Sequence, residues 1–166
     1  ENIKVEATFV RSLIYFNMVG AWGDVPLVLS VVTPEQSYSY LRESKDAIYK
    51  QIIGDLIYTK SILPEKYTGA NIGRITKYGA TAVLAKVYLT IGDKANAEKE
   101  LREIVNSGLY SLDANGNGTI NTDDYNFNFQ PNTKNSKESV LEVQYLAGVN
   151  AANSNHQELY APWHFA

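Results

Sequence analysis

The feature that most constrains the fold is a pair of helical patterns with almost no chain between them. Apolar residues recur at spacings of three and four over residues 76–91 and again over residues 93–107. Gly92 stands between the two patterns and Gly108 follows the second, a place where helices often end. A turn this short forces antiparallel packing, so residues 76–107 are predicted to form a helical hairpin.

Each helix of this hairpin carries an apolar face. The residues on these faces are Ala80, Leu84, Val87, Tyr88 and Ile91 in the first helix, and Ala97, Leu101 and Ile104 in the second. Large and small residues alternate as in tetratricopeptide repeats, in which small residues let two helices approach closely. One such match carries little weight alone, but earlier helices of comparable length favour a stacked helical array.

Two earlier segments are predicted helices. The first spans about residues 7–22 and ends near Gly23. The second begins after Ser44, a suitable N-cap, and stops before Pro64. The fold class predicted from these patterns is mostly α, with tetratricopeptide-like antiparallel helix pairs in a right-handed array, long loops and little strand.

The composition changes after Gly108, where Asn, Gly, Ser and Thr dominate as in surface loops. We therefore expect a helical scaffold over residues 1–110 and a loop-rich region over residues 111–166, both belonging to one larger domain. Within the second region, only the apolar residues between Val140 and Tyr145 indicate a short strand or an extended core segment.

The charge and composition exclude several kinds of function. The formal net charge of −3 leaves no excess of cations to neutralise phosphates, so nucleic acid is not an expected partner. The chain has no cysteine, which excludes disulfides and thiol chemistry within it, and no apolar run approaches the length of about 20 residues that a membrane helix needs. The ends of the sequence suggest a fragment of a larger protein.

A glycine-rich stretch over residues 113–124 fits the twelve-residue calcium loop of EF-hand and dockerin proteins. The predicted metal ligands are Asp113, Asn115, Asn117, Thr119 and Asp124, with Thr119 contributing its carbonyl oxygen. Gly118 permits the sharp turn, and Ile120 is expected to anchor the loop to the core. Two carboxylates predict modest affinity and a structural Ca2+ ion. The alternative is a simple Asn-Gly turn, which is common in tight loops.

The densest group of aromatic and imidazole side chains lies near the end of the chain. It consists of His156, Tyr160, Trp163 and His164. Because aromatic faces stack on the C–H faces of sugars and binding residues gather in loops, these residues are the candidate glycan contacts. The alternative is that Trp163 and Phe165 begin a core element.

Two further residues have competing interpretations. Trp22 is expected to pack against the turn that follows the first helix rather than to stack on a sugar. Arg74 could bind an anion at the start of the third helix, but pairing with a carboxylate or with loop carbonyls is favoured. The chain contains no histidine-rich metal helix and no nucleophile elbow, so catalysis is not expected.

Several stretches, taken in order, resemble the SusD/RagB family of nutrient-binding lipoproteins. They are residues 11–28 with the sequence Gly23-Asp24-Val25-Pro26-Leu27, residues 49–56 with Leu63-Pro64, residues 73–77, residues 85–89, residues 107–110 and residues 138–145. The resemblance covers about residues 5–146.

This resemblance implies a helical scaffold of tetratricopeptide-like pairs with ligand-binding loops and no catalysis. It also implies an acylated cysteine that lies outside this chain and anchors the parent protein to the extracellular face of the outer membrane. A SusC-like TonB-dependent transporter would be the partner that receives a glycan, or in some members a peptide. The leading hypothesis is thus non-catalytic glycan binding at the bacterial cell surface, and the alternative is a helical protein-interaction scaffold without a small-molecule ligand.

Overall fold

The computed structural model describes residues 2–130 and 132–144 of the chain. In order, the elements are α1 (Asn2–Trp22), β1 (Val25–Pro26), α2 (Pro34–Ser37), β2 (Arg42–Glu43), α3 (Lys45–Ile62), the 3-10 helix η1 (Gly69–Asn71), α4 (Lys77–Thr90), α5 (Lys94–Asn106) and α6 (Thr122–Phe127). The described chain is mostly helical, as the sequence predicts, and its strands form one short antiparallel pair.

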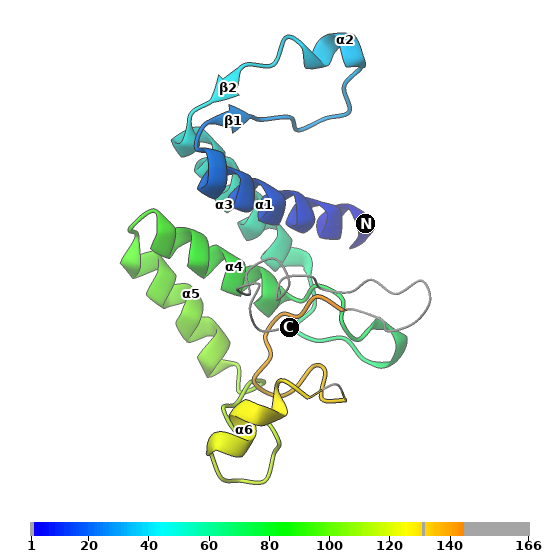
Figure 1. Ribbon diagram of the computed structural model, residues 1–166, viewed down its shortest axis with the longest axis vertical. Coiled ribbons are helices and arrows are strands. Elements are labelled where there is room, and N and C mark those ends of the chain that lie inside the picture. The colour runs from blue at the N-terminus through cyan, green and yellow to red at the C-terminus, as the bar shows by residue number, and fades with distance from the viewer. Residues whose placement is uncertain (1, 131, 145–166) are drawn as a thin grey trace, which may run out of the picture.

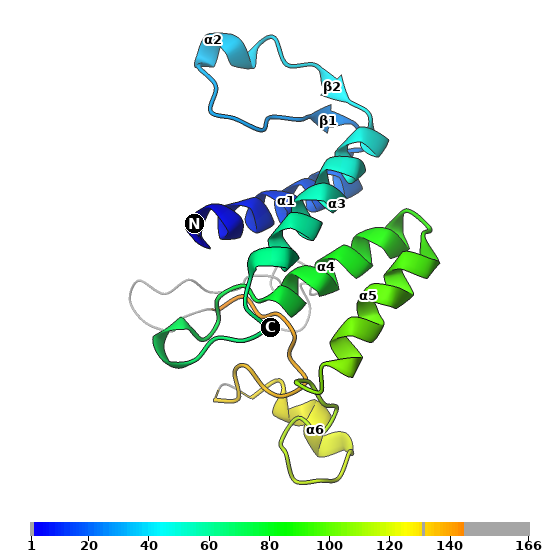
Figure 2. The same ribbon diagram turned by 180° about the vertical axis from the view of Figure 1, so that it is seen from behind.

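The long helices follow one another along the long axis of the molecule (Figure 1). α1 packs against α3, α3 packs against α4, and α4 packs against α5. The last two helices form the predicted antiparallel hairpin, which Figure 2 shows from behind. A ribbon that contains β1, α2 and β2 projects at one end, and α6 lies at the other.

The hydrophobic core lies where α1, α3 and α4 meet. Its buried members are Phe9, Val19, Val25, Ile48, Ile52, Leu56, Ala80, Val83, Leu84 and Val87. Burying each large aliphatic or aromatic side chain is worth about 1.5–3 kcal/mol, so this cluster fixes the order of the helices. None of the helices among the described residues is both long and apolar enough to cross a membrane.

The predicted helix boundaries agree with the structure where a cap defines them. The side chains of Ser44, Thr76 and Asp93 accept hydrogen bonds from backbone N–H groups in the first turns of α3, α4 and α5. Gly92 has a φ of +83°, a left-handed conformation that suits glycine and lets the chain reverse between α4 and α5.

Several expectations were wrong in detail. The first helix begins at Asn2 rather than near residue 7. Leu101 is 42% exposed, whereas the neighbouring Glu100 is buried together with Ala97 and Ile104 and pairs with Lys60 of α3. Of the two alternatives for the residues from Val140, the strand was wrong for residues 140–144, and Leu141 packs against the core as the core-segment alternative predicts.

Candidate functional site

The base of the projecting ribbon is fixed by the turn that follows α1. Gly23 has a φ of +70° and ends the helix, and Oδ1 of Asp24 accepts a hydrogen bond of 2.8 Å from the backbone N–H of Lys45. The hydroxyl of Tyr15 accepts a hydrogen bond of 2.7 Å from the backbone N–H of Val28. The Gly-Asp-Val-Pro-Leu sequence therefore has a structural role, since it ties α1, the ribbon and the start of α3 together.

The far part of the ribbon, residues 30–41, exposes apolar and aromatic side chains. Val31, Tyr38 and Leu41 are at least 82% exposed, and α2 has no buried residue. A capping box between Thr33 and Gln36 orders α2 locally. Neither a helical nor an alternating pattern of apolar residues signals this stretch in the sequence.

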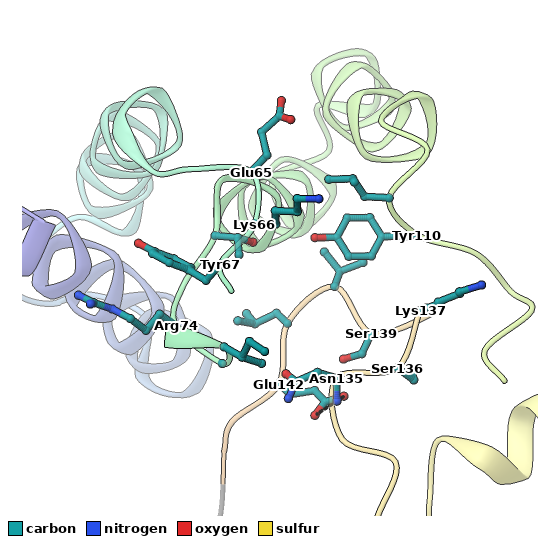
Figure 3. A pocket seen from close by; sticks show the side chains of 16 residues that line it. Glu65, Lys66, Tyr67, Arg74, Tyr110, Asn135, Ser136, Lys137, Ser139 and Glu142 are labelled. Carbon is teal, nitrogen blue, oxygen red and sulfur yellow. Dashed lines mark hydrogen bonds between the residues drawn. The ribbon is translucent and has the colours of Figure 1, made fainter. Parts of the chain in front are cut away.

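A polar crevice lies between the segment after α3 and the last described residues (Figure 3). Its volume is about 270 Å³. Figure 3 shows the Tyr110 ring projecting into it toward the side of Lys66, while Asn135, Ser139 and Glu142 lie on the opposite wall. Ligand pockets usually measure about 300–1,000 Å³, so the crevice is small for an oligosaccharide.

Several polar groups at this crevice already bond to one another. Glu142 accepts hydrogen bonds of 3.0 and 3.1 Å from the backbone N–H of Asn135, and the side-chain amides of Asn135 and Gln144 pair. Tyr110 packs edge-on against Tyr78 with ring centroids 5.8 Å apart, and burial raises the pKa of Tyr110. These contacts stabilise residues 135–144, and the groups that make them are not free to bind a ligand.

Arg74, at the edge of the crevice, is paired as the sequence predicts. Its Nε donates a hydrogen bond of 2.8 Å to Oε1 of Glu6, and its Nη1 donates one of 3.0 Å to the side chain of Asn71. The hydrogen bond and the charge of Glu6 raise the pKa of Arg74. The guanidinium also lies 5.5 Å from the centroid of the Tyr67 ring. Arg74 therefore links the segment before α4 to α1, which is a structural role.

The calcium-like loop folds around its own side chains. Asp113 accepts backbone hydrogen bonds of 3.0 and 2.9 Å from Asn117 and Gly118. Asn115 and Asn117 each accept a hydrogen bond from a backbone N–H two residues later. Asp124 also contacts this loop, since its Oδ1 accepts a hydrogen bond of 3.2 Å from the backbone N–H of Asn115.

Asp124 closes the loop from the first turn of α6. It is 2% exposed, and its two carboxylate oxygens accept backbone hydrogen bonds of 3.2 Å from Asn115 and 2.9 Å from Asn121. The hydrogen bond from Asn121 is the main cause that lowers the pKa of Asp124, so the group is held as a carboxylate. The hydrogen bond from Asn121 also makes Asp124 part of a capping box of α6.

The donors of this loop suit calcium chemically, since carboxylate, amide and carbonyl oxygens are the ligands that this ion takes. In the part of the chain that the structure describes, no group of three or more His, Cys, Asp or Glu side chains is placed to hold a metal. An ion in this loop would therefore depend on the amide and carbonyl oxygens. Ile120 is 66% exposed, so the expectation that it anchors the loop to the core was wrong.

Of the aromatic and imidazole residues singled out in the sequence, Trp22 is described by the structure and the predicted glycan contacts are not. Trp22 is 69% exposed, so the expectation that it packs against the turn was wrong for the described part of the chain. The predicted glycan contacts, His156, Tyr160, Trp163 and His164, lie outside the described residues.

The structure adds an aromatic pair that the sequence did not lead us to expect. Tyr125 and Phe129 are exposed, with ring centroids 5.0 Å apart. Their spacing of four residues was the available signal.

Comparison with known proteins identifies relatives of this chain. A SusD-like family model, described as "Starch-binding associating with outer membrane", matches residues 1–89. A SusD-like protein of Formosa agariphila is 26% identical over 148 residues, which is 89% of this chain and 26% of that protein. The chain thus spans about a quarter of the length of the curated relatives it matches.

Solved structures agree with this similarity. The chain resembles a SusD-like protein from Bacteroides fragilis with a TM-score of 0.76 and 29% identity, covering 86% of this chain and 27% of that one. It also resembles a laminarin-binding SusD-like protein with a TM-score of 0.59 and 33% identity, covering 64% of this chain and 23% of that one.

Proposed function

This chain belongs to the SusD-like family of starch-binding proteins that associate with the outer membrane, and we propose that the full-length protein captures a glycan without catalysing its cleavage. The observation that carries the proposal is the family match over residues 1–89, which spans α1, α3 and most of α4. The laminarin-binding neighbour has the same fold over 64% of this chain.

The described residues would serve as the scaffold of this binding protein. Their polar crevice is small and several of its groups bond to one another, which argues against an oligosaccharide site there. The candidate sugar contacts remain His156, Tyr160, Trp163 and His164, a cluster of ring side chains of the kind that stack on pyranose faces. Aromatic rings combine a large apolar area with a polar edge, which suits a ligand that has both C–H faces and hydroxyls.

We further propose that the protein acts at the extracellular face of the outer membrane, anchored by a lipid outside this chain, and delivers the glycan to a SusC-like TonB-dependent transporter. The family's association with the outer membrane supports this location. A binding protein held beside the transporter would raise the local ligand concentration.

A structural calcium ion in the loop over residues 113–124 is part of this proposal. The oxygen donors of Asp113, Asn115, Asn117, Thr119 and Asp124 fit the preferences of the ion. When bound, calcium would neutralise the two carboxylates and hold α6 against the loop. With few carboxylates, the expected dissociation constant is about 10⁻⁴–10⁻³ M, as in extracellular modules.

The test uses the full-length protein and a panel of polysaccharides that includes laminarin, starch and a charged glycan. Electrophoresis in gels that contain each glycan measures retardation, and chromatography of the glycan measures cleavage. We expect retardation by at least one glycan and no shortened product. Absence of retardation with every glycan, together with tight association with the transporter, would favour a protein-interaction scaffold instead, and a shortened product would contradict a non-catalytic role.

A further inference from the structure

The loop over residues 113–124 contains two Asn-Gly pairs, Asn115-Gly116 and Asn117-Gly118. An asparagine followed by glycine can react with its own backbone, because glycine has no side chain to hinder the approach of its nitrogen to the asparagine amide. Both glycines have a positive φ, +74° for Gly116 and +85° for Gly118. The two pairs therefore share their sequence and backbone conformation, so that their surroundings decide whether either of them reacts.

The side-chain carbonyl of each asparagine already accepts a hydrogen bond. Oδ1 of Asn115 accepts one of 2.9 Å from the backbone N–H of Asn117, and Oδ1 of Asn117 accepts one of 2.8 Å from that of Thr119. Attack on Cγ of the asparagine places negative charge on this oxygen, and a donor aimed at the oxygen lowers the barrier to attack. This activation is common to the two pairs and does not distinguish them.

The attacking nitrogens differ, and that of Gly118 is bound to an anion. Its N–H donates a hydrogen bond of 2.9 Å to Oδ2 of Asp113. To attack Asn117, this nitrogen must lose its proton and leave the carboxylate, and the negative charge that it gains would form beside another negative charge. The Asp113 carboxylate therefore protects Asn117.

The nitrogen of Gly116 has the opposite electrostatic environment. In the part of the chain that the structure describes, its N–H donates no hydrogen bond. A Cβ added at Gly116 would lie 3.0 Å from Nζ of Lys137, so an ammonium group lies beside this stretch of backbone. Figure 3 shows the Lys137 side chain turned away from the crevice, and its carbonyl accepts a hydrogen bond of 3.0 Å from the N–H of Ser111. The positive charge of Lys137 stabilises the anion that the Gly116 nitrogen must become.

From this contrast we propose that Asn115 is a site of spontaneous deamidation, whereas Asn117 is protected. Hydroxide removes the proton from the N–H of Gly116 and forms water. The nitrogen then bonds to Cγ of Asn115, the bond from Cγ to Nδ2 breaks, and Nδ2 takes a proton from water and leaves as ammonia, which returns the hydroxide. Water opens the resulting succinimide ring at Cγ to give aspartate, or at the backbone carbonyl carbon to give isoaspartate.

The two products change the loop in different ways. An aspartate at position 115 adds a carboxylate at a predicted calcium ligand position, which should raise the affinity of the loop for calcium. Isoaspartate places Cβ in the main chain, so it lengthens the backbone within the loop. The effect on calcium rests on the proposed calcium loop, whereas the deamidation itself needs no ion.

Peptide mapping of the full-length protein by mass spectrometry tests this proposal, in mildly alkaline buffer with a chelator that removes calcium. Fragment masses locate the replacement of NH2 by OH at each asparagine over time. In the native protein we expect Asn115 to convert at least about tenfold faster than Asn117, a difference of about 1.4 kcal/mol in activation free energy. In denaturant, where the surroundings are lost, the two rates should agree within about threefold. No conversion at Asn115 in the native protein, or conversion no faster than at Asn117, would overturn the proposal.

Two substitutions test the role of the charges. Lys137→Gln removes the ammonium group and should slow the conversion of Asn115 by at least about twofold, since an exposed charge is partly screened. Asp113→Asn keeps an acceptor for Gly118 but removes the negative charge, and should speed the conversion of Asn117 by at least about threefold. Rates that neither substitution changes would overturn the proposal.

Circular dichroism shows whether each variant folds, and the comparison of native and denatured unsubstituted protein decides the question if a variant does not. The deamidation rates are measured without glycan and without calcium. Their outcome is therefore independent of the proposed function.

Discussion

Arg11 and Asp55 join α1 to α3 through one carboxylate oxygen: Oδ2 of Asp55 lies 2.6 Å from Nη2 and 3.1 Å from Nε of Arg11. Oδ1 of the same carboxylate accepts a hydrogen bond of 2.9 Å from Gln51. The Asp55 side chain is 13% exposed and that of Arg11 is 31% exposed. Arg11 and Asp55 lie in different stretches of the family resemblance, and their pair joins these two stretches in the fold.

Asp55→Ala should destabilise the protein because it leaves the partly buried guanidinium without its partner. We expect the free energy of unfolding to fall by about 1.5–3 kcal/mol, the usual cost of losing hydrogen bonds to a charged group. Glu98→Ala, which breaks the exposed pair with Arg102, should change it by less than about 0.5 kcal/mol. Urea unfolding followed by circular dichroism measures both. Equal effects of the two substitutions would show that the Arg11 pair contributes no more than a surface pair.

The buried charges between α3 and α5 predict a dependence of stability on pH. Burial opposes the charge of Glu103, but hydrogen bonds and charges from Lys60 and Lys77 outweigh it and lower the pKa of Glu103 below its ordinary value of 4.5. The ionised carboxylate therefore stabilises the fold above that value, and this contribution is lost as the pH falls through the lowered pKa.

Glu103→Gln should accordingly destabilise the protein at neutral pH and much less near pH 3. Glu100 and Glu65 also face these lysines, so part of the pH dependence will remain in the variant. Urea unfolding at both pH values measures the difference between the variant and the unsubstituted protein. A difference that does not shrink at low pH would contradict the role of Glu103.

Gly73 is predicted to be essential for the fit between the segment before α4 and Gln144. Its φ is +93°, and a Cβ there would lie 2.7 Å from Cγ of Gln144. Gly73→Ala should therefore cost about 1–3 kcal/mol of unfolding free energy. Gly54→Ala is the matched control: Gly54 lies within α3 with no atom near the new Cβ, so this change should stabilise by about 0.5–1 kcal/mol. Thermal unfolding of both variants checks the opposite signs.

Calcium should stabilise the protein through the loop over residues 113–124. At a calcium concentration about ten times the dissociation constant, the expected gain is about 1.4 kcal/mol, seen as a higher unfolding temperature. Asp113→Asn should abolish this gain, whereas Asp123→Asn should retain it because Asp123 occupies no predicted ligand position. If calorimetry of the metal-free protein shows no calcium heat, the loop is an Asn-Gly turn and not a metal site.

The sequence predicted those parts of the fold that local chemistry determines. Ser44, Thr76 and Asp93 are caps that need only their own first helical turn, so the starts of α3, α4 and α5 could be located. The inward position of Leu101 was wrong because Lys60, distant in sequence, draws Glu100 inward instead. The ribbon could not be predicted from the sequence, because its position depends on hydrogen bonds between side chains of α1 and the backbone of Val28 and Leu29.

The site could be predicted less completely than the scaffold. Spacing alone indicated the calcium-like loop, since its ligand positions lie close together in the sequence. The exposure of Trp22 and Ile120 depends on which elements cover them, and local pattern carries no such information. The candidate sugar contacts from His156 to His164 lie outside the described residues, so their role stays a prediction.

We propose that the full-length protein binds a glycan and that Trp163 is one of the residues in contact with it. Calorimetric titration with the glycan that binds in gel retardation tests it most directly, comparing the unsubstituted protein with Trp163→Ala and with Trp22→Ala, a control tryptophan that is 69% exposed in the scaffold. We predict saturable binding that Trp163→Ala weakens by at least about tenfold, as expected for an aromatic anchor, and that Trp22→Ala leaves unchanged. Unchanged affinity in Trp163→Ala would remove that residue from the site, and no binding heat with any glycan would contradict glycan binding by this protein.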